Sequence, residues 1–170
     1  MPTLEQDRAY FEAALSSLKK YLLSDILFYP LTGSLPRLTL GGLLLAKRRL
    51  DAGNHAPHLT RKLAAVKEKW RAAWTKKAAT ELDARLTLWR NYLSDVQKEP
   101  EEYATDYPRE VRWRVMLALL VDEAEQTPPE LTVLDQRLHT QLRAGEFIWD
   151  DSLKSEFDRK NFWFLYGNLR

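Results

Sequence analysis

The chain has 170 residues, a length suited to one domain that buries roughly two-thirds of its unfolded surface. Apolar residues make up 45% of it and charged residues 29%, which is typical of a folded globular protein and excludes extended disorder. The absence of cysteine excludes disulfides, zinc–thiolate sites and thiol nucleophiles, and it fits a reducing compartment. Residues 1–15 lack the apolar core of a signal peptide. We therefore predict a single cytoplasmic domain over residues 1–170.

The net charge is only +2, but the charges are unevenly distributed along the chain. Residues 44–77 contain ten Lys or Arg and two acids, whereas residues 99–130 contain nine acids and three arginines. We expect these two segments either to pair with each other or to present faces of opposite charge to a partner.

Residues 1–56 are predicted to form two helices joined by an irregular apolar connection. The first helix covers about residues 4–23 and starts with a capping-box pattern at Thr3. The second begins at Thr39 and stops near Gly53. An apolar stretch over residues 26–46 is interrupted by prolines and glycines, which excludes a membrane-spanning helix. We accordingly expect no membrane partner.

Residues 57–98 are predicted to form one unusually long helix. The segment from Leu59 to Val96 contains no glycine or proline and is rich in strong helix formers. Such a helix would be roughly 60 Å long, whereas a compact domain of this size is only about 40 Å across. We therefore expect the helix to project, to bend or to be covered by a second subunit.

The apolar residues of this long helix form two heptad seams on different faces, which change register at residues 75–77. The first seam contains Leu59, Leu63, Val66, Trp70 and Ala73, and the second contains Ala79, Leu82, Leu86, Trp89, Leu93 and Val96. The change of register predicts different packing partners for the two halves, or a kink between them. The candidate homodimer interface consists of Trp74, Ala79, Leu82, Leu86 and Trp89.

Residues 99–170 are predicted to contain two more helices and an aromatic tail. A helix over about residues 109–126 is apolar on every side through its middle and should be the central buried helix. A further helix is expected over residues 130–144, after two prolines, and the aromatic tail should dock onto the bundle. No strand pattern of convincing length is present. The predicted fold is all-α, an irregular bundle of about five main helices.

The most suggestive functional feature is a group of four cations on one side of the long helix, within about a quarter of its circumference. These candidate nucleic-acid or polyanion ligands are Arg61, Lys62, Lys69 and Lys76. Several cations on a rigid rod can neutralise successive phosphates and release counterions. The alternatives are a solvated face, or pairing with the acidic segment. In the paired arrangement the acids Asp122, Glu123 and Glu125 would lie near Lys76 and Lys77.

Other chemistry is less well supported by the sequence. Trp70 and Trp74 lie one helical turn apart and could stack on bases or line a ligand cleft, although Trp70 is on the apolar seam. His55 and His58 flank a proline, but no further ligand lies nearby, so we predict no metal site. The sequence has no phosphate-binding glycine loop, H-E-x-x-H or G-x-S-x-G motif. We therefore assign no catalytic residue and expect no cofactor.

Three functional hypotheses follow. The first is a non-enzymatic interaction or scaffold protein that self-associates as a homodimer through the long helix. The second is binding of nucleic acid or another polyanion by the basic face of residues 61–76. The third is an enzyme or small-molecule binder with a tryptophan-lined cleft, which the missing catalytic motifs make the least favoured.

Overall fold

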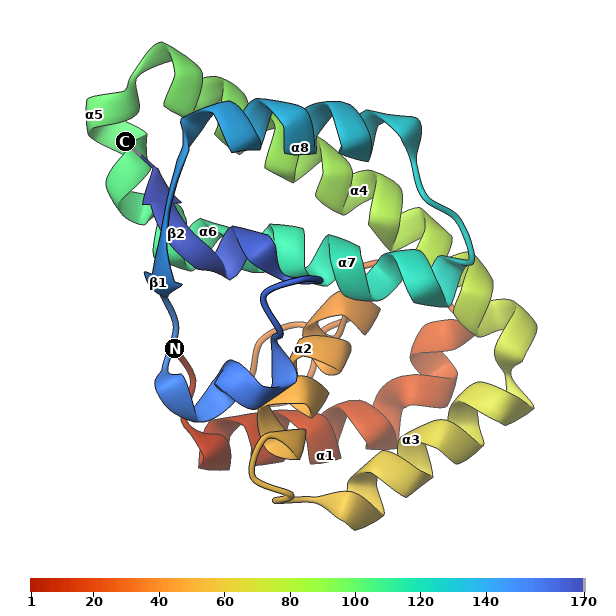
Figure 1. Ribbon diagram of the computed structural model, residues 1–170. Helices are drawn as coiled ribbons and strands as arrows, with labels where there is room; N and C mark the ends of the chain where they lie inside the picture. The colour runs from red at the N-terminus through yellow and green to blue at the C-terminus, as the bar shows by residue number, and fades with distance from the viewer. Residues whose placement is uncertain (170) are drawn as a thin grey trace.

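The structure, a computed structural model, describes residues 1–169 and is mostly helical (Figure 1). The longer helices are α1 (Leu4–Leu22), α2 (Leu40–Asp51), α3 (Pro57–Lys69), α4 (Arg71–Lys98), α7 (Arg112–Ala124) and α8 (Pro129–Gln141). The shorter ones are α5 (Pro100–Tyr103), η1 (Ala104–Asp106), α6 (Tyr107–Glu110), η2 (Asp151–Glu156) and η3 (Trp163–Leu165). Two strands, β1 (Leu142–Phe147) and β2 (Tyr166–Leu169), pair with each other. The predicted helical class is confirmed, but the prediction of an all-α fold did not include the small sheet.

The first two helices start at side-chain caps. The Thr3 hydroxyl accepts a hydrogen bond from the Gln6 amide at 3.2 Å, and the Gln6 side chain accepts one from the Thr3 amide at 2.8 Å. At the start of α2 the Thr39 hydroxyl accepts from the Gly42 amide at 2.9 Å. Each cap satisfies amide groups that have no partner within the first helical turn.

The prediction of one helix over residues 57–98 is wrong, because the backbone leaves the helical conformation at Trp70 (φ −117°, ψ 35°). Hydrogen bonds continue on both sides, from the Trp70 amide to Val66 and from the Trp74 amide to the Trp70 carbonyl. A change of direction was expected near residues 75–77 and occurs earlier in the chain. The two parts have different partners, since α3 packs on α1 whereas α4 packs mainly on α7.

Helix α7 crosses the centre of the molecule, with α4 and α8 on one side of it and α1 and α2 on the other (Figure 1). Its residues Val115, Leu117 and Leu120 are completely buried. The helix predicted over residues 109–126 is in fact α6 and α7, separated by a turn at Val111. It ends where Glu125 adopts a left-handed conformation with φ 55°.

The second seam of the predicted long helix is already covered within the single chain. Leu82 and Trp89 are completely buried, Trp74 and Leu86 are 1% and 6% exposed, and Ala79 is half-buried. Because α7 and α8 cover this face of α4, no second copy of the chain is needed to shield it. The homodimer stays a prediction, without support from these five residues.

The C-terminal sheet replaces the last turn of the helix predicted over residues 130–144, which ends at Gln141 instead. Strand β1 pairs antiparallel with β2, with an irregularity between Ala144 and Phe147. Gly167 has φ 153°, and a Cβ atom there would collide with the carbonyl oxygen of Arg143. The aromatic tail is held to the bundle by the buried Tyr107 hydroxyl, which donates to the Phe164 carbonyl at 2.6 Å.

The contact between α4 and α7 gives a first testable prediction. Leu82→Ala should lower the free energy of unfolding by roughly 2–5 kcal/mol, because it leaves a cavity in a completely buried site. Val133→Ala on α8, at a side chain that is 55% exposed, is the control and should change it by less than about 0.5 kcal/mol. Urea denaturation measures both, and equal stabilities of the two variants would contradict the packing described here.

Candidate polyanion-binding surface

The four predicted cations all lie at the surface, on the two helices that meet at Trp70. Arg61, Lys62 and Lys69 are on α3 and Lys76 is on α4, and every one of these side chains is exposed. Within residues 1–169 none of them is within ion-pair distance of a carboxylate. Their charges are therefore available to a partner.

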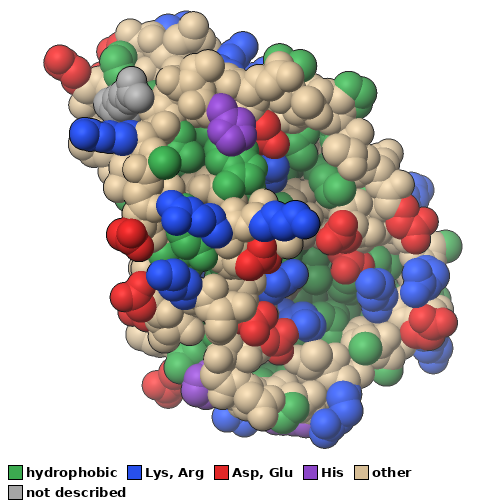
Figure 2. Space-filling view, in the orientation of Figure 1, with side chains coloured by type: hydrophobic (Ala, Val, Ile, Leu, Met, Phe, Trp, Pro, Cys, Tyr) green, Lys and Arg blue, Asp and Glu red, His purple; other side chains and the backbone are tan. Residues whose placement is uncertain are grey.

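The acidic end of α7 neutralises other cations. Glu123 pairs with Lys67 at 2.7 Å and accepts a hydrogen bond from the Trp74 indole at 2.6 Å. Glu125 lies 4.0 Å from Arg71. The basic segment therefore pairs in part with the acidic segment, as one alternative expected, but through Lys67 and Arg71 and not through Lys76 and Lys77. On the face of the molecule seen in Figure 2, Lys and Arg side chains are interspersed with carboxylates.

Helix α1 adds two cations that the sequence reasoning did not assign to this surface. Lys19 and Lys20, in its last turn, are exposed and have no ion pair in the described chain. The Lys19 ammonium lies 5.3 Å from the centre of the Trp70 ring, and the Lys69 ammonium lies 5.8 Å from it. Both distances are within the range of cation–π attraction. The adjacent lysines were visible in the sequence, but the parallel course of α1 and α3 was not.

We call these six residues the basic surface: Lys19, Lys20, Arg61, Lys62, Lys69 and Lys76. Two of the carboxylates beside it are already engaged by other cations. Glu12 is 3.3 Å from Arg8, and Glu68 is 3.4 Å from Arg71. The basic surface therefore keeps an excess of positive charge.

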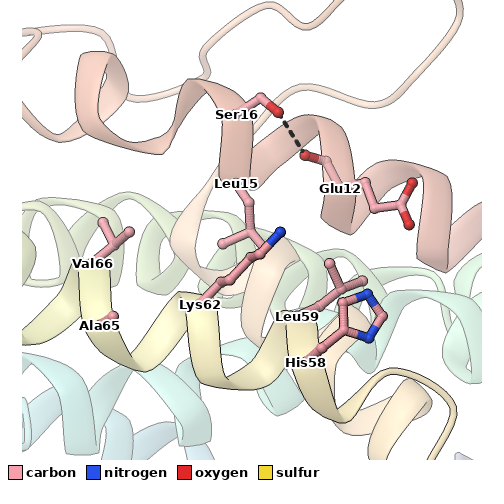
Figure 3. Close-up of a pocket in the computed structure, with 8 residues that line it drawn as sticks. All are labelled: Glu12, Leu15, Ser16, His58, Leu59, Lys62, Ala65 and Val66. Atoms are coloured by element: carbon pink, nitrogen blue, oxygen red, sulfur yellow. Dashed lines mark hydrogen bonds between the residues drawn. The ribbon is translucent and has the colours of Figure 1, made fainter.

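Part of the basic surface borders a shallow groove between α1 and α3 (Figure 3). The groove has apolar walls formed by Leu15, Leu59 and Val66. Lys62 extends from α3 toward α1, so that its aliphatic stem covers apolar surface and its ammonium group remains in solvent.

The segment that follows α1 is tied down by a buried lysine. The Lys77 ammonium donates hydrogen bonds to the carbonyl groups of Ser24 at 2.7 Å and Ile26 at 3.0 Å. It also lies 4.6 Å from the centre of the Tyr21 ring. Desolvation lowers the pKa of Lys77, and the nearby Asp25 carboxylate opposes that shift. Lys77 therefore positions the backbone of this segment and is not part of the exposed charge.

The most strongly buried carboxyl group is Glu81, which is completely shielded from solvent. Its Oε1 accepts from the Gly41 amide at 2.9 Å and from the Arg85 guanidinium at 3.3 Å. Burial raises the pKa of Glu81, while Arg85 and the amide groups at the start of α2 act in the opposite direction. No substrate can reach this group in the closed structure, so it joins α2 to α4 and does not form a catalytic site.

The remaining sequence candidates do not assemble into a site. Trp74 is buried, so that a cleft lined jointly by Trp70 and Trp74 is not formed. His55 and His58 are exposed, and residues 1–169 contain no group of three or more His, Asp or Glu side chains that could hold a metal ion. Among the same residues, none of the helices combines the length and apolarity needed to cross a bilayer.

Comparisons with known proteins do not add to this description. The chain matches no protein-family model, and no curated protein or solved structure is significantly similar to it.

The buried position of Glu81 predicts a pH dependence of stability. Its pKa is higher in the folded protein than its ordinary value of 4.5, so the folded state binds this proton more tightly than the unfolded state. The stability that results is fully present below pH 4.5 and is lost as the pH rises through the folded pKa.

The variant Glu81→Gln removes this titration. We expect the free energy of unfolding of the wild type, measured in urea relative to the variant, to fall as the pH rises from about 4.5 to 7. Asp83→Asn removes an exposed carboxylate from the same helix and controls for the loss of one negative charge. A difference that grows with pH would show that the ion pair with Arg85 outweighs the desolvation of Glu81.

Proposed function

We propose that this protein binds a polyanion through the basic surface. The supporting observation is that six exposed cations from three helices have no carboxylate partner in residues 1–169. The adjacent Lys67 and Arg71, in contrast, are paired with acids. This separation supports a basic surface that is held apart from the acidic end of α7.

The arrangement suits a ligand with repeated negative charges. Exposed cations on a rigid scaffold attract such a ligand at long range, and each phosphate they neutralise releases condensed counterions. The ammonium groups of Lys19 and Lys69 both lie within cation–π distance of the Trp70 ring, which positions one cation from α1 and one from α3.

The other two functional hypotheses have less support. The scaffold hypothesis relied on an apolar seam that needed a second subunit, and four of the five residues in the candidate interface are buried within the chain. The hypothesis of a ligand cleft relied on tryptophans, and Trp74 and Trp89 belong to the core. The burial of these residues does not affect the exposed cations of the basic surface.

A charge-neutralisation experiment tests the proposal. One variant replaces Lys19, Lys62, Lys69 and Lys76 with Gln. The control variant replaces Lys98, Arg143, Lys154 and Lys160, which are equally exposed and lie elsewhere, with Gln. Both variants remove four positive charges. Binding of labelled heparin and labelled double-stranded DNA is followed by fluorescence anisotropy at several salt concentrations.

We expect the first variant to bind at least about tenfold more weakly than the wild type, and the control variant to bind nearly normally. For DNA, each lost phosphate contact should also reduce the log–log salt slope by about 0.9. If the two variants lost affinity equally, binding would depend on net charge alone, and the basic surface would not be the binding site. No binding by the wild type at low salt would refute the proposal.

A further inference from the structure

Three large apolar side chains remain exposed on one short segment beside the basic surface. Leu23 is 57% exposed, Ile26 is 47% exposed and Phe28 is 37% exposed. The other exposed large apolar side chains in residues 1–169 lie at the N-terminus and on α8. Single exposed apolar residues are ordinary, but three within six positions of the chain form a local apolar patch. We call Leu23, Ile26 and Phe28 the apolar segment.

The end of α1 places part of this segment among the lysines. Leu23 follows Lys19 by four positions and Lys20 by three, and it still has a helical backbone. Residues at these spacings lie on the same face of a helix. The exposed leucine therefore shares its face with two unpaired ammonium groups.

Helix α4 holds the other part of the segment in place. Because the Lys77 ammonium bonds the carbonyl groups of Ser24 and Ile26, the backbone of the segment lies along α4. Lys76, the neighbour of this anchor, is exposed. The segment also contains one exposed carboxylate, that of Asp25, which acts electrostatically on Lys77. The segment thus links the lysine-bearing end of α1 with the part of α4 that carries Lys76 and Lys77.

From this juxtaposition we infer that the polyanion is the surface of an anionic lipid bilayer. Leu23 and Ile26 enter the boundary between headgroups and acyl chains, and Lys19, Lys20, Lys69 and Lys76 contact the headgroups. The inference rests on the proposed function, because it names the ligand of the same basic surface. It replaces the expectation of no membrane partner, which considered only membrane-spanning segments.

The side-chain chemistry favours a bilayer over a nucleic acid. Aliphatic side chains such as Leu23 and Ile26 have no flat face on which a base could stack, and they form no hydrogen bonds with base edges. Lys19 and Lys20, which share a helix face with Leu23, act as point charges, whereas base readout and bidentate phosphate contacts favour arginine. Stable attachment to a bilayer requires two signals, and an apolar group next to a polybasic patch supplies both.

Vesicle cosedimentation tests this inference with the intact chain. The probes are vesicles of pure phosphatidylcholine, vesicles in which about one-third of the lipid is phosphatidylserine, and soluble heparin. The variant Leu23→Ser/Ile26→Ser removes the apolar contacts. Phe28 is left unchanged because the Arg85 guanidinium lies 5.4 Å from the centre of its ring. The matched control, Leu4→Ser/Val133→Ser, alters side chains that are 45% and 55% exposed elsewhere.

We expect the wild type to bind the anionic vesicles and not the neutral ones. The Leu23→Ser/Ile26→Ser variant should partition at least about tenfold more weakly, because the apolar area that enters the interface is lost. Its binding to heparin should equal that of the wild type, and an unchanged far-UV circular dichroism spectrum and urea midpoint show that the variant is folded. The control variant should behave as the wild type with every probe.

The outcomes separate this inference from the proposed function. Heparin binding without binding to anionic vesicles would overturn the lipid assignment and leave the basic surface as a site for a soluble polyanion such as a nucleic acid. Vesicle binding that is equal in the Leu23→Ser/Ile26→Ser variant and the wild type would also overturn it. If the wild type bound neither heparin nor anionic vesicles at low salt, the proposed function itself would fail.

Discussion

The break in the helical backbone at Trp70 determines where the charges of this protein lie. A continuous helix over residues 57–98 would carry the first cations away from the bundle on a projecting rod. The break instead lays α3 along α1, with Leu59 and Leu63 buried in their contact, and directs α4 toward α7. As a result the ammonium groups of Lys19 and Lys69 both lie within cation–π distance of the Trp70 ring. The basic surface is therefore a product of tertiary packing rather than of one helix.

A second constraint, the buried polar contact between α2 and α4, holds the other side of the bundle in register. The side-chain carboxylate of Glu81, a residue of α4, lies at the N-terminus of α2, where free amide groups and the helix dipole favour a negative charge. Gly41 is required there, because a Cβ atom would lie 2.5 Å from Glu81 Oε1 and 3.2 Å from the Cβ of Met116. A side chain at this position would push α2 away from both α4 and α7. The contact thus fixes the position of α2 relative to α4.

Local sequence signals predicted the starts of α1 and α2 and the helical class but not the long-range arrangement. Thr3 and Thr39 act within one turn of the chain, so that their capping roles could be deduced from neighbouring residues. The break at Trp70 has no glycine or proline to mark it, and it arises because α3 and α4 pack against different helices. The sheet depends on pairing between residues 142 and 169, which no local pattern reports.

The candidate site was also predictable only in part, because local spacing along one helix can be deduced from the sequence whereas packing between helices cannot. The four cations of residues 61–76 could be grouped by helical spacing, and the structure places all of them at the surface. The contribution of Lys19 and Lys20 required knowing that α1 and α3 lie side by side. The residues of the candidate interface were expected at the surface, but four of the five are buried within the chain. An apolar seam in a sequence shows only that a helix face is covered. It does not show whether the cover, here α7 and α8, belongs to the same chain.

The small number of buried residues in α3 also affects how readily this helix opens locally. This helix buries only Leu59 and Leu63, whereas α4 buries residues along its whole length. The free energy needed to detach a helix locally depends largely on the apolar contacts that it gives up. The backbone amides of α3 should accordingly exchange with solvent hydrogen through local opening, well before those of α4 and α7. Half of the basic surface thus lies on α3, which buries the fewest residues of the longer helices.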